Sequence, residues 1–147
     1  MNNNFKVDLG NLKNIADILI IQEGSPLFTE KQLTAELDDE NKIILIAYLY
    51  DIPVAFICFA LLVDHIDIIN IVTRNGYKNQ GIASYLIKEL YKFGFSKNIN
   101  EFFLEVRVTN TPAISLYEKN GFKKISMRKK YYTNPIEDAL IYKYISK

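Results

Sequence analysis

The sequence predicts an α+β domain with a mixed, mostly antiparallel sheet that is flanked by helices. Segments rich in β-branched and aromatic residues alternate with segments whose apolar residues recur at helical spacing. Three strand-like segments follow one another with short connections, which is typical of an antiparallel meander. Further on, a strand, a helix and a strand follow in the order of a parallel unit. The predicted order is therefore strand, two helices, three strands, helix, strand, helix and two strands.

The first half of the chain predicts one strand and two helices. Phe5–Asp8 is the strand, and the apolar residues of Leu12–Leu19 fall on one face of the first helix. Thr29 and Gln32 have the spacing of a capping box, so the second helix should begin at that point and end near Leu37.

The centre and the second half predict the remaining elements. Apolar residues from Ile82 to Leu90 mark one face of a helix, and Gly121 is placed to end a later one. The predicted strands are Ile43–Tyr50, Val54–Val63, one within Asp64–Thr73, Phe102–Val108, Phe122–Arg128 and Ala139–Ile145, and the later helix is Asn110–Asn120.

The composition is that of one domain spanning residues 1–147, because 49% hydrophobic and 24% charged residues are enough for a packed core. The net charge of +1 lacks the excess of basic residues expected of a nucleic-acid-binding domain, so we expect no direct nucleic-acid partner and no membrane partner. Met1–Asp8 is polar without a signal region, and no apolar run reaches the length of a membrane span. A cytoplasmic protein is the resulting expectation.

The chain contains one cysteine and one histidine. A single cysteine excludes an internal disulfide and a multi-cysteine metal site, so no metal is expected. Cys58 lies in the apolar run Ala55–Val63, which favours a buried core thiol over a nucleophile. His65 is interpreted as a strand residue without an assigned role.

The turn Lys78–Ala83 joins a predicted strand to a predicted helix. Backbone N–H groups at a helix start have no partner within the helix, and the helix dipole adds partial positive charge there. Gly81 allows close approach of a ligand to the backbone, and Lys78 adds a positive charge. The turn by itself indicates an anion site of modest specificity, because it is neither a Walker turn nor the three-glycine dinucleotide fingerprint.

Longer segments resemble the GNAT superfamily of N-acetyltransferases. Asn70–Val72 followed by YKNQGIA at Tyr77–Ala83 is similar to its acetyl-CoA motif, although Lys78 stands where the superfamily usually has Gln or Arg. LEVRVTNTPAISLYEKNGF at Leu104–Phe122 and RKKYYTNPIEDALIY at Arg128–Tyr142 resemble the RimI branch, whose members acetylate the N-terminal alanine of a small-subunit ribosomal protein. The resemblance implies the GNAT acyl-CoA N-acyltransferase fold, in which the pantetheine arm lies between two splayed central strands.

The resemblance also implies which residues contact acetyl-CoA as a cosubstrate. It assigns this role to strand residues whose backbone meets the acetyl and pantetheine portion, to the phosphate turn, and to the cap of the later helix: Asn70, Ile71, Val72, Lys78, Asn79, Gln80, Gly81, Ile82, Ala83 and Asn110.

Two residues are candidates for acid–base chemistry. Strand alternation places Glu105 on one face with Phe103 and Arg107, where its carboxylate is either a general base or one half of an ion pair. The resemblance favours the general base. The helical spacing of Tyr117 is that of a core aromatic, whereas the resemblance makes it the general acid that protonates the CoA thiolate. A tyrosine suits that role because its ordinary pKa is near that of a thiol.

The expected function is acetyl transfer by direct attack of a neutral α-amine on the thioester, with an alanine-initiated ribosomal N-terminus as acceptor. Tyr131 and Tyr132 are expected to line the acceptor cleft. One alternative is an acetyltransferase for another protein N-terminus or a small amine. The other is a non-catalytic acyl-CoA-binding module, which would require neither Glu105 nor Tyr117.

Overall fold

A computed structural model describes residues 4–145 of the chain. The helices are the 3₁₀ helix η1 (Leu12–Asn14), α1 (Ile15–Ile21), α2 (Glu30–Asp38), α3 (Ile82–Ser96) and α4 (Thr111–Lys119). The strands are β1 (Phe5–Leu9), β2 (Lys42–Leu49), β3 (Ile52–Leu61), β4 (Ile66–Thr73), β5 (Glu101–Arg107), β6 (Lys123–Thr133) and β7 (Ile136–Ile145). The element order and the α+β class agree with the sequence prediction.

The strands form one sheet in the order β1-β2-β3-β4-β5-β7-β6. Neighbouring strands are antiparallel except β4 and β5, which are parallel and are connected through α3. The predicted meander is therefore β2–β3–β4, and the predicted parallel unit is β4–α3–β5. No helix in the described residues is long and apolar enough to cross a membrane.

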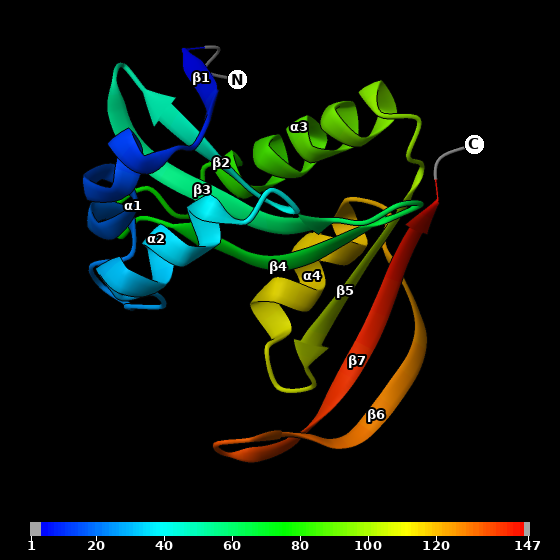
Figure 1. Ribbon diagram of the computed structural model, residues 1–147. Coiled ribbons are helices and arrows are strands. Elements are labelled where there is room, and N and C mark those ends of the chain that lie inside the picture. The colour runs from blue at the N-terminus through cyan, green and yellow to red at the C-terminus, as the bar shows by residue number, and fades with distance from the viewer. Residues whose placement is uncertain (1–3, 146–147) are drawn as a thin grey trace.

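The helices cover the sheet through two apolar clusters. One cluster joins the inner face of α3 and the start and middle of α4 to the strands, with Leu86, Leu90, Phe102 and Phe122 fully buried. The other packs α1 and α2 against the opposite face of β2 and β3. Figure 1 shows α1 and α2 together at one end of the sheet, away from α4. Burial of these side chains fixes the frame on which the site is built.

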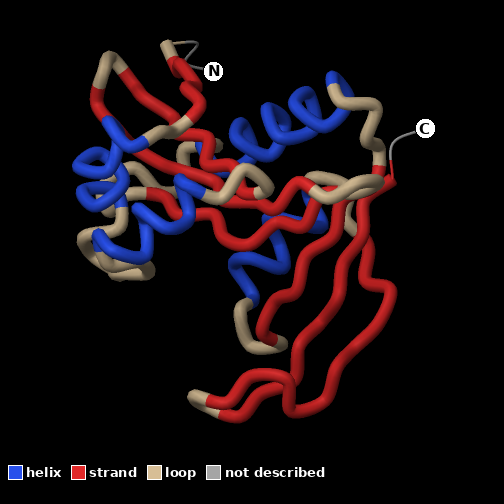
Figure 2. The backbone as a smooth tube through the Cα atoms, in the orientation of Figure 1, coloured by secondary structure: helices blue, strands red, loops and turns tan. Residues whose placement is uncertain are grey.

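The sheet divides between β4 and β5. In the described part of the chain β4 pairs with β5 only at Ile66, Asp67 and Ile68. The β3–β4 ladder skips Ile69, which is therefore the extra residue of a β-bulge. A bulge bends its strand and increases the local twist, so β4 turns away from β5 at this residue. Figure 2 shows the strands of the two halves of the sheet running in different directions beyond this point. The splay implied by the family resemblance is present.

Several element ends differ from the sequence prediction by two residues or more, and two of these differences have a clear local cause. The helix predicted to begin at Leu12 has its first turn as 3₁₀, because Asn11 and Asn14 cap each other and set a separate start there. The strand predicted to end at Arg128 continues to Thr133 beyond a register irregularity. Strand alternation could not extend through this irregularity, where Lys130 has a left-handed φ of 51°.

Candidate active site

The first cleft has a volume of about 930 Å³ and opens beside the free edge of β4. Its walls come from β4, the turn after β4, the start of α3, α4, and the end of α1 with the loop that follows it. Nearly all residues predicted to contact acetyl-CoA line it together: Asn70, Ile71, Val72, Lys78, Asn79, Gly81, Ile82, Ala83 and Asn110. Gln80 does not line the cleft, although its neighbours on both sides do.

The turn before α3 and the first residues of this helix line the cleft. Gly81 is the N-cap of α3 with a left-handed φ of 80°, a conformation that is costly for residues with a Cβ. The first helical hydrogen bond runs from the N–H of Tyr85 to the carbonyl of Gly81 at 3.0 Å. The N–H groups of Ile82–Ser84 therefore have no acceptor inside the helix, and they lie where an anion gains most from the helix dipole.

Helix α4 forms the other wall, and both of its ends are fixed. The side chain of Asn110 caps its start by accepting a hydrogen bond from Ala113 N at 3.3 Å. At its end Gly121 has a φ of 97°, and the N–H groups of Gly121 and Phe122 donate to Glu118 and Tyr117. This pattern is a Schellman motif, and it confirms Gly121 as the residue that ends this helix. It holds the backbone of Tyr117 in place.

Tyr117 lines the first cleft and is 8% exposed. Its ring packs edge-on against Phe122, with the ring centroids 5.8 Å apart. Burial, with a smaller contribution from Tyr132, raises the pKa of Tyr117 to about 12. Desolvation disfavours the phenolate, so the pKa of Tyr117 in this fold lies above the ordinary value from which its acid role was argued. Tyr117 remains a hydrogen-bond donor throughout the physiological pH range.

Asn120 braces α4 against α3, a role that sequence reasoning did not find. Its Nδ2 donates to Ser84 Oγ at 3.0 Å and to Leu116 O at 2.8 Å. Its carbonyl accepts a hydrogen bond from the Tyr91 hydroxyl at 2.8 Å. Ser84 belongs to the first turn of α3, so this brace sets the distance between the phosphate turn and the helix that contains Tyr117. The residues come from two helices that are separated along the chain by β5, and no sequence spacing relates them.

A second cleft, of about 730 Å³, lies beside β5 on the sheet face opposite α3. Ile68 and Ile69 of β4 line it, and the next residue, Asn70, lines the first cleft, so the two clefts adjoin where the strands diverge. Glu105, Tyr131 and Tyr132 all line this second cleft. The predicted base and the predicted acceptor-binding tyrosines therefore share one cleft, while Tyr117 lines the other.

The contacts of Glu105 are compatible with both interpretations of this residue, the ion pair and the general base. Arg128 Nε lies 3.6 Å from Glu105 Oε2, so the ion pair exists. The hydroxyl of Tyr131 donates a hydrogen bond to Glu105 Oε1 at 3.1 Å, and this contact raises the pKa of Tyr131. The Glu105 side chain is 34% exposed toward the cleft. An exposed pair contributes little stability, and it leaves the carboxylate accessible to a ligand.

Tyr132 is an electrostatic neighbour of both candidate catalytic residues. Burial raises its pKa, with the Glu105 carboxylate as the next contribution. Tyr132 in turn contributes to the raised pKa of Tyr117. Its ring meets that of Tyr131 edge-on, with centroids 5.1 Å apart. The paired tyrosines thus line the second cleft, with Tyr132 near enough to Tyr117 to influence its pKa.

The two clefts have opposite charge. Among the described residues that line the first cleft, Lys78 and Lys119 are basic and none is acidic. The second cleft is lined by four carboxylates against one arginine: Asp64, Asp67, Glu101, Glu105 and Arg128. The near-neutral net charge of the chain does not reveal that basic and acidic residues are concentrated at different clefts. This distribution suits an anionic ligand in the first cleft and a cationic ligand in the second.

Two further reactive side chains, Cys58 and His65, have different surroundings. Cys58 is fully buried, and burial raises the pKa of its thiol to about 12, which confirms the core interpretation. His65, to which no role was assigned, lies at the second cleft between two carboxylates. Its Nδ1 is 2.7 Å from Asp64 and its Nε2 is 3.5 Å from Asp67.

Residues 13–122 match the acetyltransferase (GNAT) family. Because this match spans well over half of the chain, the protein belongs to the GNAT family. The fold agrees with that of the ribosomal-protein-S18-alanine N-acetyltransferase from Escherichia coli. The two structures superpose with a TM-score of 0.85 at 24% identity, over 97% of this chain and 95% of that one.

Two curated relatives are more similar in sequence over shorter segments. An N-alpha-acetyltransferase from Saccharolobus solfataricus is 41% identical over 75 residues, which are 50% of this chain and 44% of that protein. The ribosomal protein bS18-alanine N-acetyltransferase from Escherichia coli is 34% identical over 89 residues, 59% of this chain and 60% of that protein. The chain thus spans about half the length of these relatives.

Proposed function

We propose that the protein is an acetyl-CoA-dependent N-acetyltransferase whose acceptor is the α-amine of a protein N-terminus. The observation that supports this most is the pair of clefts that adjoin where β4 leaves β5. The basic cleft, with its open helix start, fits the pyrophosphate and pantetheine of acetyl-CoA. The acidic cleft, with Glu105, fits an amine that approaches the thioester from the other side of the sheet.

Glu105 is the group that accepts the proton of the attacking amine, directly or through a water molecule. An α-amine has a pKa of about 7.7–8.0, so roughly a tenth of it is already neutral at pH 7. The base is therefore needed mainly as the C–N bond forms and the nitrogen becomes acidic. The backbone of Asn70–Val72 lies beyond the last pair of the β4–β5 ladder, and an N–H group there can stabilise the developing oxyanion.

Tyr117 acts on the departing sulfur in this proposal. With a pKa of about 12, it would give up its proton to a thiolate of pKa near 8.5 only in a transfer that is roughly a thousandfold uphill. A hydrogen bond from its hydroxyl to the sulfur, formed as the C–S bond breaks, is the more favourable role. The final proton for the thiolate then comes from solvent or from the proton released by the amine.

A ribosomal N-terminus that begins with alanine is the first candidate acceptor, since the relative from Escherichia coli acts on ribosomal protein bS18. The four carboxylates of the second cleft favour a peptide with basic residues after the α-amine. The archaeal N-alpha-acetyltransferase supports the alternative that other protein N-termini are accepted. A non-catalytic acyl-CoA-binding module would bind CoA and transfer nothing.

The experiment compares wild type with Glu105→Gln, a change that preserves shape and still accepts the Tyr131 hydrogen bond. Acceptors are an alanine-initiated ribosomal peptide, the same peptide with a blocked α-amine, and a panel of small amines. We expect transfer to the free α-amine only, with kcat lowered about 10²- to 10⁴-fold in the variant. Calorimetry should show unchanged CoA affinity. Full activity of the variant would refute the role of Glu105, and preference for small amines would refute the acceptor.

A further inference from the structure

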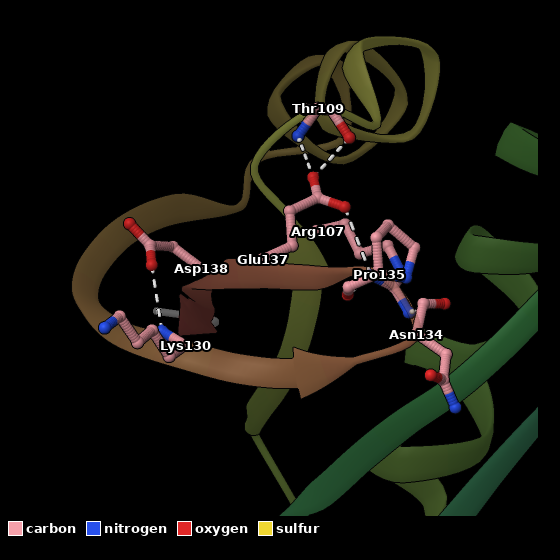
Figure 3. Close-up of polar contacts among 7 residues, drawn as sticks. All are labelled: Arg107, Thr109, Lys130, Asn134, Pro135, Glu137 and Asp138. Carbon is pink, nitrogen blue, oxygen red and sulfur yellow. Dashed lines mark hydrogen bonds and ion pairs between the residues drawn. The ribbon is translucent and has the colours of Figure 1, made fainter.

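Arg107 at the end of β5 holds the turn between β6 and β7 (Figure 3). Its Nη1 donates to Pro135 O at 3.1 Å and to Glu137 Oε1 at 3.1 Å, and its Nη2 donates to Asn134 O at 3.3 Å. The planar guanidinium has several donors in a fixed fork, so one side chain can satisfy two acceptors of the turn and one at the start of β7. A lysine ammonium at this position would have no such geometry.

Glu137 extends this contact toward the first cleft. Its second carboxylate oxygen accepts hydrogen bonds from the backbone N–H of Thr109, at 2.9 Å, and from the Thr109 hydroxyl. The side chain of Glu137 is 13% exposed. Thr109 directly precedes Asn110, the cap of α4. The Arg107–Glu137–Thr109 cluster thus joins the β6–β7 hairpin to the segment from which the helix containing Tyr117 begins.

The hairpin needs such support at the position of the paired tyrosines. The β6–β7 ladder is irregular between Arg128 and Tyr132. Within this irregular segment the N–H of Lys130 donates to the side chain of Asp138 at 2.9 Å. Regular cross-strand pairing therefore does not fix the backbone of Tyr131, and other contacts must do so.

Arg107 supports this segment through a contact with the Tyr132 ring. Its guanidinium carbon lies 4.2 Å from the centroid of the Tyr132 ring, within cation–π range. The Tyr132 ring packs edge-on against Tyr131, whose hydroxyl donates to Glu105. A continuous series of contacts therefore connects Arg107, through two tyrosine rings, to the candidate base.

We propose that Arg107 and Glu137 are positioning residues for the acceptor: they hold the irregular hairpin segment so that Tyr131 and Tyr132 form a fixed wall beside Glu105. The inference rests on the proposed function, because it takes the acceptor to bind beside Glu105. In this proposal Arg107 and Glu137 touch neither ligand, but they help to determine the affinity for the acceptor. Their effect falls mainly on the second cleft, because Arg107 contacts the Tyr132 ring directly, whereas the cluster reaches the first cleft only through Thr109 and leaves the phosphate turn as it is.

The test uses Arg107→Met, Arg107→Lys and Glu137→Gln in the full chain. The matched control is Glu36→Gln, which removes an ion pair of similar burial between α2 and β2. The Lys42–Glu36 side chains are 34% and 18% exposed, against 32% and 13% for Arg107 and Glu137. Steady-state kinetics give KM for an alanine-initiated peptide and for acetyl-CoA separately. Hydrogen–deuterium exchange reports opening of residues 129–138 independently of activity.

We expect Arg107→Met and Glu137→Gln to raise the peptide KM about tenfold or more, because a displaced wall loses its fit to the acceptor. The KM for acetyl-CoA should change by less than about twofold, and Arg107→Lys should recover only part of the loss. Residues 129–138 should exchange faster in these variants and not in Glu36→Gln. Equal changes in both KM values, a peptide KM no different from that of the control, or unchanged exchange in the hairpin would overturn the proposal.

Failure of the proposed function gives a different result from failure of this inference. If wild type acetylates no amine, the acetyltransferase proposal fails, and exchange and CoA calorimetry still decide whether the cluster fixes the hairpin. Faster exchange at residues 129–138 with unchanged CoA affinity then supports the positioning role. Unchanged exchange overturns it whether or not the wild type is active.

Discussion

Tyr117→Phe removes one hydroxyl from the wall of the first cleft and leaves the ring in place. The ring keeps its contact with Phe122, and the Schellman motif that fixes the backbone does not involve the hydroxyl. Folding should therefore be affected little. The change isolates the hydrogen bond that we propose to form on the departing sulfur.

The magnitude follows from the strength of that hydrogen bond. A hydrogen bond to a charged group contributes about 1.5–3 kcal/mol, which corresponds to a decrease of about 10- to 150-fold in kcat. Because burial raises the pKa of Tyr117 to about 12, the phenol stays protonated below pH 10. The ratio of wild-type to variant kcat should therefore be constant from about pH 6 to 9.5. A tyrosine with an ordinary pKa near 10 would begin to titrate within this range.

The assay measures release of the CoA thiol at saturating peptide across this pH range. Tyr48→Phe is the matched control, because Tyr48 is also 8% exposed and its hydroxyl donates to Asp17 at 2.6 Å, in the other apolar cluster. The control should lose stability and keep kcat. If the ratio of wild-type kcat to Tyr117→Phe kcat falls toward one between pH 8 and 9.5, the Tyr117 phenol is not protonated as assigned. Full activity of Tyr117→Phe would refute its role in the reaction.

Three further predictions concern the cofactor turn, the acidic cleft and the hairpin. Gly81→Ala places an alanine in the left-handed conformation at φ 80°, which costs about 1–2 kcal/mol. The CoA affinity measured by calorimetry should therefore fall by up to about 30-fold. An unchanged affinity would contradict the role of the turn in binding CoA. Asp67→Asn should raise the KM of a basic peptide about two- to fivefold at low salt and less at high salt, and a neutral peptide serves as the control. The hydrogen bonds from Thr109 hold the pKa of Glu137 below its ordinary 4.5, so its contribution to stability is present above pH 4.5 and is lost as the pH falls below that value. The difference in Tm between wild type and Glu137→Gln should therefore shrink on acidification, and a constant difference would count against the contact.

Local features of the fold were predictable because their causes are local. The capping box of Thr29 and Gln32 forms as expected, with both hydrogen bonds present. Gly121 ends α4 in the left-handed conformation that its residue type permits. The meander and the parallel unit followed from the order of elements. The phosphate turn was also visible, since a strand, a glycine-containing turn and a helix are adjacent along the chain.

The arrangement around Glu105 was not predictable, because its partners lie far away in sequence. The Tyr131 hydroxyl that contacts Glu105 belongs to a residue 26 positions later, and Glu137, the partner of Arg107, lies 30 positions later. These contacts depend on the register of β7 between β5 and β6. The raised pKa of Tyr117 likewise depends on burial in the assembled core. Residue type indicated that Glu105 and Tyr117 could act, whereas the fold decides what surrounds them.

The central claim is transfer of an acetyl group from acetyl-CoA to a protein α-amine. Tandem mass spectrometry of an alanine-initiated ribosomal peptide that also contains internal lysines, incubated with the protein and acetyl-CoA, tests this most directly. We expect one acetyl group, located on the α-amine, and no product with Glu105→Gln at the same reaction time. An acetyl group on lysine, or an unmodified peptide in the presence of protein that binds CoA, would contradict it.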